Sequence, residues 1–551
     1  MITITPNGNI KLYSGIRLDN TYQNALSFSS AAARDAYFLE NNPYLIGSWE
    51  KVTYQRVTSG QCDVEIAIGD VYTANYMAFQ NKGFSNRWFY AFVTNVEYVN
   101  NITTRIYYEI DVLTTFYFDW NYLPSFVERE HTATDAIGDN LVPENINYGE
   151  CGAFAREWGY RFDNWSIIVA LSTFGREGTS DEGIAASAKA GDYIAGVSIV
   201  EYESITSFKN SFLNVISGDT REDVVCVFMF PNPLVTIAND PDVANGTLIV
   251  NQSQTMHATR PATLDGYTPK NRKLFTYPFS YLCVDTGSVT NNYRWEWFDH
   301  VAGLADYSFT IRGACVPGGG IYAAPVNYKN SGAYAGGTGI DHYIPVFDER
   351  IEAPKLPQVC YPVDSFKAWL AQSESTRQNK ILHSVAAGAL GSAGTGAMLG
   401  AAGGPIGVVG GAVAGGLIGA VGGAIGGKIS DDMSKSEAAD MKNKTAGNLS
   451  GTLEVVDNKY GFIFKYMTLS AQDARIVDDY FTMFGYAVNA VKTPQIRTRP
   501  HWNYIKTCGL NMAAQNVPAD YVRKIKAIHD QGVTYWKVHD EIGNYALNNT
   551  V

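Results

Sequence analysis

The segment from Ser384 to Gly427 constrains the chain most, because it contains no Asp, Glu, Lys, Arg or His. Gly and Ala make up most of it, with Val, Leu and Ile spaced between them. Many of its glycines recur every four residues, which on a helix places them along one groove and permits close approach of a second backbone. That spacing is typical of helices that associate in lipid. The longest ladder is formed by Gly403, Gly407, Gly411, Gly415, Gly419, Gly423 and Gly427.

Water and lipid favour different conformations of this segment. Twelve glycines lie between Gly403 and Gly427, and at roughly 1 kcal/mol each they disfavour an isolated helix in water by about 10 kcal/mol. In hydrocarbon the backbone has no other hydrogen-bonding partner, so the helix becomes nearly obligatory. The eight Val, Leu and Ile residues after Pro405 contribute about −2 to −5 kcal/mol to insertion. We interpret the segment as a loop that stays sheltered in a soluble particle and inserts when released.

A hairpin is the expected form of the inserted loop. Residues 385–402 and 406–427 each approach the ~20 residues that span a bilayer core, and Gly403-Gly404-Pro405 has turn chemistry. The polar residues Lys380, His383 and Lys428 anchor both ends on one side, and His383 is either a pH-sensitive latch or an ordinary surface residue. The predicted membrane-insertion residues are Gly403, Pro405, Val408, Val409, Gly411, Val413, Gly415, Leu417, Ile418, Gly419, Val421, Gly423 and Ile425.

Two other interpretations of this segment remain open. It is apolar enough to be a buried or lumen-filling structural element, although so many glycines would pack poorly. Gly- and Ala-rich runs also occur as flexible linkers, but those are usually rich in Ser or other polar residues.

Charge and cysteine usage narrow the functional classes. The formal net charge is −12, whereas a protein that grips phosphates is expected to be basic. Tight DNA binding is therefore not expected, while a conduit along which DNA slides without adhering is compatible. The seven cysteines show no CxxC spacing, so neither a metal site nor a disulfide framework is predicted. The N-terminus lacks a secretory signal pattern, which favours folding in a reducing cytoplasm.

The sequence pattern predicts an α+β fold that is mostly β. A hairpin is expected where Phe89–Val99 and Arg105–Val112 flank Asn100-Asn101, with a strand at Cys62–Ile68 and a short helix at Ser30–Glu40. Short apolar runs between Gly-, Asn- and Pro-rich loops predict further strands at Ser166–Leu171, Val224–Phe230, Thr247–Val250 and Tyr307–Cys315.

Helices are expected at five further places. One lies at Ile205–Ile216, and two polar helical arms, after Asp364 and at Ser430–Thr445, carry the apolar loop. Near the C-terminus, Ser470 and Asp473 resemble a capping box for a helix that stops at Gly485. A last helix runs from Pro518 to His529, before a strand at Val533–Val538.

These elements suggest an antiparallel β tube or barrel wall built from both ends of the chain, with an inserted outer domain. The expected parts are 1–149 (tube), 150–361 (β-rich outer domain), 362–383 (arm), 384–427 (apolar loop), 428–447 (returning arm) and 448–551 (α/β part completing the tube). The last part is locally basic, and its charges serve subunit contacts, a solvated face or contact with passing DNA. They belong to Lys492, Arg497, Arg499, Lys506, Arg523, Lys524 and Lys526.

No catalytic motif is present in the sequence. The eight histidines show no HExxH pairing, and there is no GxSxG elbow, P-loop or dinucleotide fingerprint. The carboxylates Asp348, Glu349 and Glu352 have the residue types that a glycosidase uses, which leaves a cell-wall hydrolase as the minor enzymatic alternative. We predict no catalytic residues, no metal site and no cofactor.

Several short stretches resemble the tail-knob (distal tail tube) proteins of small short-tailed phages of Gram-positive bacteria. Their order along the chain, around a Gly/Ala-rich loop, carries the resemblance. They are Trp88–Thr94, Glu109–Leu113, Ser125–His131, Arg497–Arg499, Trp502–Tyr504, Gly532–Trp536 and Ile542–Tyr545.

The resemblance implies a homohexameric β-walled tube at the tip of a virion tail, made in the host cytoplasm. Six hydrophobic loops would plug its lumen and then form a pore in the host cytoplasmic membrane for genome ejection. The implied partners are other copies of the chain, neighbouring tail proteins (an upper collar or tail tube and a tip protein), membrane lipid and DNA in passage. A purely structural tube or hub with a lumen-plugging loop is the alternative, and residues 150–360 do not follow the family pattern.

Overall fold

The computed structural model describes residues 5, 7–40, 42–55, 57, 60–83, 86–172, 189–194, 197–202, 206, 224–238, 247–249, 253–298, 307–315, 319–329, 349–356, 358–359, 361–363, 444–446 and 459–551. They belong to two compact units. Unit 1 comprises Met1–Cys151, Ala262–Phe279 and Leu469–Val551, and unit 2 comprises Gly152–Pro261 and Ser280–Thr468. The chain therefore passes between the units four times. Antiparallel sheets dominate both, which confirms the prediction of a mostly β fold.

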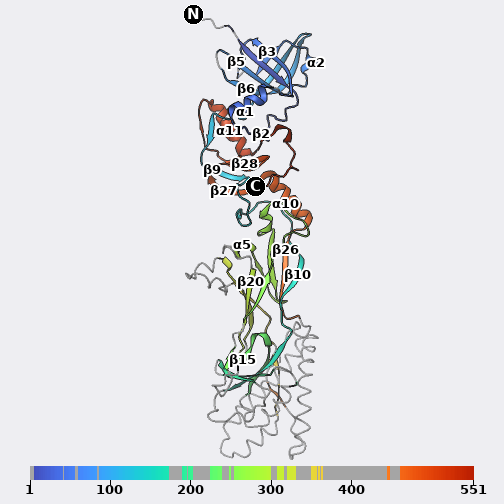
Figure 1. Ribbon diagram of the computed structural model, residues 1–551, viewed down its shortest axis with the longest axis vertical. Coiled ribbons are helices and arrows are strands. Elements are labelled where there is room, and N and C mark those ends of the chain that lie inside the picture. Colours follow the sequence, from blue (N-terminus) through green and yellow to red (C-terminus); the bar gives the residue numbers. More distant parts are fainter. Residues whose placement is uncertain are drawn as a thin grey trace, which may run out of the picture. The chain divides into compact units, whose positions relative to one another are not determined.

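The first sheet of unit 1 is antiparallel and six-stranded (Figure 1, blue). Alternate side chains of its strands point into one apolar core, as at Ile106, Tyr108 and Ile110, which are at most 5% exposed. In spatial order the strands are β3 (Leu45–Val52), β1 (Gly8–Tyr13), β5 (Tyr76–Asn81), β6 (Trp88–Asn100), β7 (Thr103–Ile110) and β4 (Gln61–Val64).

The predicted hairpin is confirmed as β6 and β7, which pair in register from Ala91↔Ile110 to Asn100↔Thr103. A register shift between Val93 and Asn95 interrupts the pairing of β6 with β7. Beyond that bulge the side chains reach solvent, and Tyr98 is 54% exposed.

Two predicted strands of this region end earlier than expected. Val112 was expected to end the second strand of the hairpin but starts α3 (Val112–Thr115), since the Asp111 carboxylate accepts a hydrogen bond from Thr114 N and caps that helix. Likewise β4 ends at Val64, and Ile68 starts α2 (Ile68–Val71).

The predicted helix at Ser30–Glu40 is α1 (Ala31–Leu39), with Ser30 Oγ accepting from Ala33 N at 3.1 Å. Arg34 of α1 is nearly buried, and it donates to the carbonyl oxygens of Thr114 and Thr115. These bonds tie α1 to α3.

The second sheet of unit 1 joins strands from both ends of the chain. β2 and β30 pair in parallel, whereas the other neighbours are antiparallel. In spatial order the strands are β2 (Asn24–Leu26), β30 (Val533–Trp536), β28 (Trp502–Cys508), β9 (Ser125–Glu130) and β27 (Tyr486–Lys492). A separate pair is formed by β8 (Trp120–Tyr122) and β29 (Met512–Ala514).

Both predicted C-terminal helices are confirmed. In α10 (Ala471–Phe484), Ser470 Oγ accepts from Asp473 N at 3.1 Å, and Gly485 ends the helix at φ +66°. α11 (Ala519–Gln531) follows Pro518 and ends at Gly532, just before β30.

The segment 262–279, which we call the anchor segment, contains the 3-10 turn η3 (Arg272–Phe275). It lies in unit 1 although the sequence pattern places it in the outer domain. The reason is apolar packing, because Leu264, Leu274, Phe275 and Phe279 share a buried cluster with α10 residues. Conversely β26 (Gly461–Thr468), expected in the C-terminal part, belongs to unit 2, where it pairs with strands on both sides.

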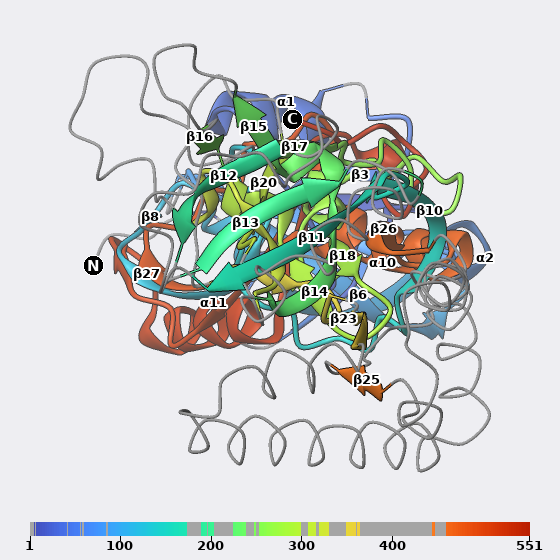
Figure 2. The same cartoon turned by 90° about the horizontal axis from the view of Figure 1, so that it is seen from below.

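The described residues of unit 2 form three larger antiparallel sheets. The first has the order β10 (Gly152–Arg161), β26, β18 (Ser280–Asp285), β19 (Thr290–Tyr293), and the second β17 (Gln254–Ala258), β20 (Tyr307–Gly313), β21 (Ile321–Pro325), β22 (Ile351–Glu352). The third, shown in Figure 2, has the order β12 (Lys189–Ile194), β13 (Val197–Tyr202), β11 (Trp165–Ser172), β14 (Val224–Pro231), β23 (Gln358–Val359).

Smaller elements are also present among the described residues of unit 2. They are β15 (Thr236–Ala238) paired with β16 (Thr247–Ile249), β24 (Tyr361–Val363) paired with β25 (Lys444–Ala446), η2 (Asn232–Leu234) and α5 (Trp295–Phe298). The four predicted strands of this region are thus present as β11, β14, β16 and β20. The predicted Ser430–Thr445 helix is wrong at its end, because Lys444 and Thr445 pair with β24. The rest of that helix, nearly all of Ile205–Ile216 and the arm after Asp364 lie outside the described residues.

Candidate functional site

The predicted membrane-insertion residues and their anchors lie outside the described residues. Their roles stay predictions. They are Gly403, Pro405, Val408, Val409, Gly411, Val413, Gly415, Leu417, Ile418, Gly419, Val421, Gly423 and Ile425, with Lys380, His383 and Lys428.

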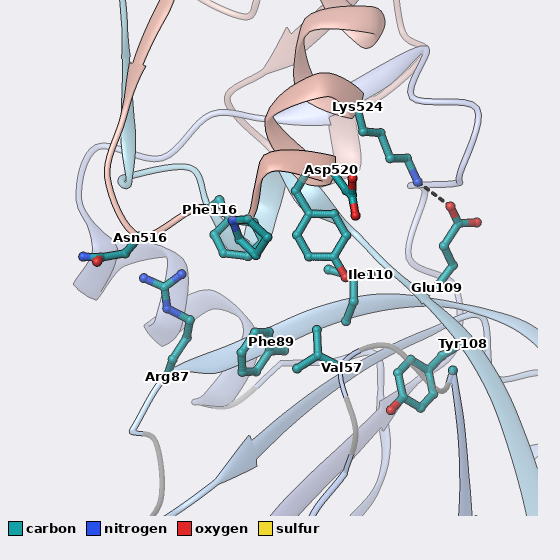
Figure 3. Close-up of a pocket in the computed structure, with 13 residues that line it drawn as sticks. Val57, Arg87, Phe89, Tyr108, Glu109, Ile110, Phe116, Asn516, Asp520 and Lys524 are labelled. Carbon is teal, nitrogen blue, oxygen red and sulfur yellow. Dashed lines mark hydrogen bonds and ion pairs between the residues drawn. The ribbon is translucent and has the colours of Figure 1, made fainter.

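A pocket of about 740 Å³ lies in unit 1, where α11 faces β6, β7 and α3 (Figure 3). Its apolar walls include Phe89 of β6, Ile110 of β7 and Tyr521 of α11. The rings of Phe116 and Tyr521 lie 5.4 Å apart and link the α3 side to the helix.

Ion pairs border this pocket. Lys524 of α11 binds the Glu109 carboxylate, as drawn in Figure 3. Burial alone would raise the pKa of Glu109, but hydrogen bonds from Lys524 and Asn20 and the Lys524 charge hold it below its ordinary value. Arg87 pairs with Asp119 at 2.7 Å and stacks over the Phe116 ring.

The side chains that line the pocket are better suited to binding an apolar or aromatic group than to catalysing a reaction. Aromatic and aliphatic side chains line it, and the nearby charges of Lys524 and Arg87 are balanced by carboxylates. Within the part of the chain that the structure describes, no group of three or more His, Cys, Asp or Glu side chains could hold a metal ion. Sequence reasoning missed this pocket, because its walls come from residues 57–116 and 516–524 and no local pattern joins them.

Most of the C-terminal basic residues are engaged within unit 1. Lys492, Lys506, Arg523 and Lys524 pair with Glu130, Glu128, Asp520 and Glu109 respectively. Arg497 donates to Phe28 O, and Arg499 is 2% exposed. The positive charge that these side chains can offer to an outside anion is correspondingly reduced.

The carboxylates considered for a hydrolase are surface ion pairs where they are described. Glu349 binds Lys329, and Glu352 binds Arg350 at 3.1 Å. Asp348 lies outside the described residues.

Two buried histidines of unit 1 are fully bonded as neutral rings. His131 Nδ1 accepts from Tyr504 N at 2.7 Å, and its Nε2 donates to Thr482 O at 3.1 Å. His529 Nδ1 donates to Ile525 O at 2.8 Å, and its Nε2 accepts from the hydroxyls of Tyr122 and Tyr535. Burial, chiefly, lowers the pKa of His131 to about 3 and that of His529 to about 4.

We expect unit 1 to lose stability as the pH falls from 6.5 towards 4. The unfolded histidines bind protons near pH 6.5 while the folded ones do not, so each contributes a loss of about 1.4 kcal/mol per pH unit across that window. Urea unfolding of wild-type protein and His529→Gln at several pH values measures the slope, which should be shallower in the variant. His501→Gln is the control, because His501 is part-exposed beside Glu541. An equal slope for His529→Gln and wild type would contradict the assignment.

Among the described helices, none combines the length and the apolar composition that a bilayer crossing requires.

Comparison with known proteins gives the class of this protein. Residues 247–550 match the family described as the C-terminal domain of the tail knob protein gp9 of Bacillus phage phi29. Residues 6–121 match the N-terminus of caudoviral major tail proteins. The chain is 25% identical to the tail knob protein gp9 of Bacillus phage B103 and 23% identical to that of phage phi29, with 98% of each chain covered. The solved tail knob protein gp12 of bacteriophage C1 has the same fold, with a TM-score of 0.62 at 14% identity over 99% of both chains.

These likenesses define a structural protein of a phage tail. The chain belongs to the family of tail knob proteins that includes gp9 of Bacillus phage phi29. The family resemblance stated from the sequence is therefore confirmed. The expectation that residues 150–360 do not follow the family pattern is wrong for 247–360, which the family model matches. As a tail knob protein it is a component of the virion tail and associates there with other tail proteins.

Proposed function

We propose that the chain assembles as a homohexamer into a tube at the tail tip, through which viral DNA passes without tight binding. In this proposal unit 1 builds the tube, the described strands of unit 2 form an outer domain, and 362–383 and 428–447 carry the loop 384–427. The loop first fills the lumen and then inserts into the host cytoplasmic membrane as a pore for genome ejection. The proposed partners are other copies of the chain, an upper collar or tail tube, a tip protein and membrane lipid.

One observation carries this proposal. A tail knob protein with 17% charged residues overall contains a segment, Ser384–Gly427, without a single ionisable side chain. In water its glycines oppose a helix, whereas in a bilayer the backbone must pair with itself. A tail tip is the part of a virion that meets the host surface, so a lipid-seeking segment there has a direct use. The net charge of −12, with most C-terminal basic residues engaged within the chain, supports passage of DNA without adhesion.

We expect the full-length protein to release dye from liposomes and a variant lacking Ser384–Gly427 to assemble without releasing dye. Dye release and electron microscopy of the same samples measure the two properties separately. Assembly with equal leakage from both proteins would overturn the loop assignment, and assembly without leakage from either would support a purely structural tube.

A variant with Leu at Gly411, Gly415 and Gly419 should assemble but leak less, because its helices cannot approach closely. Turnover of purified peptidoglycan by wild-type protein would favour a hydrolase instead.

A further inference from the structure

At the anchor segment the chain leaves unit 2, contributes residues to unit 1 and then returns to unit 2. It follows β17 and precedes β18, and both of these strands belong to unit 2. Its own hydrogen bonds described below are made to unit 1. The chain of unit 2 is therefore connected to unit 1 at its two ends, Gly152 and Thr468, and also through the anchor segment between them.

Asp478 of α10 is the centre of this attachment. Its side chain is fully buried and accepts hydrogen bonds from Tyr267 Oη at 2.7 Å, Lys270 N at 2.8 Å, Asn271 N at 3.0 Å and Asn271 Nδ2 at 2.8 Å. Asn271 Nδ2 also donates to Thr482 Oγ1 at 2.8 Å, and Asn271 Oδ1 accepts from Tyr486 Oη at 3.2 Å. A buried carboxylate with this many donors holds the segment tightly, because losing the bonds would leave it unsatisfied.

Further contacts extend the attachment over the length of the segment. At one end Asp265 accepts from Ala471 N at 3.1 Å, the first residue of α10. Lys273 donates to Val142 O at 2.7 Å and pairs with Glu144. The apolar side chains of Leu264, Leu274, Phe275 and Phe279 are at most 3% exposed.

We propose that the anchor segment is a noncovalent crosslink that stabilises unit 2 although its bonds are made in unit 1. When unit 2 unfolds with the segment attached, its chain consists of two loops tied to unit 1, 152–261 and 280–468. When the segment is released, the same chain is one long loop with more conformations. A crosslink that restricts the unfolded chain stabilises the folded state, in the manner of a disulfide closing a long loop. Releasing the segment should therefore destabilise unit 2.

Hydrogen exchange of the full-length protein in low urea, followed by mass spectrometry, tests this inference. In Asp478→Asn we expect peptides of β18, β20 and β26 to exchange at least tenfold faster than in wild type, while those of β5 and β6 change less than twofold. Tyr267→Phe removes one of the bonds and keeps the fold, so it should accelerate the same unit 2 peptides by a smaller factor. Asp479→Asn is the matched control, because Asp479 is the exposed neighbour on the same helix.

The result that overturns the inference is faster exchange of the anchor segment alone in both variants, with unit 2 unchanged. Equal acceleration in β5, β6 and unit 2 would also overturn it, because the effect would then be a general loss of stability. The outcome does not depend on membrane activity, so it is separate from the test of the proposed function.

Discussion

Replacing Gly485 by alanine should be among the most destabilising single substitutions in this protein. Gly485 ends α10 at φ +66° and ψ −152°, a region of backbone space that essentially only glycine adopts. A Cβ built there would lie 2.6 Å from His131 N and closer still to the carbonyl of Glu130. These atoms belong to the backbone at the end of β9, which is held by pairing on both sides and cannot yield without breaking the sheet.

We expect Gly485→Ala to lower the free energy of unfolding of unit 1 by more than about 4 kcal/mol, the range reached only by severe steric or core defects. Urea unfolding followed by circular dichroism measures the loss. Gly509→Ala is the matched control, because Gly509 also has a positive φ, of +72°, but no described residue beyond its chain neighbours comes within 4 Å of the place a Cβ would take. That variant should lose about 1 kcal/mol, the conformational cost alone. Similar losses in the two variants would show that the contact with β9 does not matter.

Replacing Glu144 by glutamine should have the second large effect. The Glu144 side chain is 1% exposed and binds both Arg129 and Lys273, whose side chains are 12% and 3% exposed. It also accepts from Ala487 N at 2.9 Å. Arg129 in turn donates to Gly485 O at 2.6 Å. The ion triad of Arg129, Glu144 and Lys273 therefore also holds the end of α10 at Gly485. Without the carboxylate charge, the positive charges of Arg129 and Lys273 would remain unpaired with Glu144 in a site that is nearly closed to solvent.

We expect Glu144→Gln to cost about 3–5 kcal/mol of the free energy of unfolding, as when one member of a buried ionic group is removed. Glu150→Gln, at an exposed position a few residues away, should change it by less than about 0.5 kcal/mol. The double variant Glu144→Gln, Lys273→Met should lose less than the sum of its parts, because it also removes a stranded cation. Strict additivity in that double-mutant cycle would refute the role of the triad.

Local signals in the sequence predicted local structure well. Ser30, the pair Ser470 and Asp473, and Gly485 mark helix ends by hydrogen bonds and backbone angles that involve only a few neighbouring residues. The alternation around Asn100-Asn101 predicted the β6–β7 hairpin for the same reason.

Features that depend on distant residues were not predictable. Asp478 looks like any polar helix residue, yet its partners Tyr267 and Asn271 lie more than 200 positions earlier in the chain. Ile476 of α10 is apolar, yet it is 60% exposed. The pocket bordered by the Glu109–Lys524 pair joins residues 415 positions apart. The apolar segment Ser384–Gly427 is the reverse case, because its composition predicts its chemistry while its residues lie outside the described part of the chain.

The parallel pairing of β2 with β30 has a consequence for biosynthesis. Nearby, Arg17 N donates to His539 Nε2 across 522 residues of sequence. A ribosome adds roughly 5–20 residues per second, so β2 waits about half a minute to two minutes for β30, its partner strand. Throughout that interval the apolar side chains of β2 lack their partner strand, and it is then that a host chaperone would be of most use to the phage.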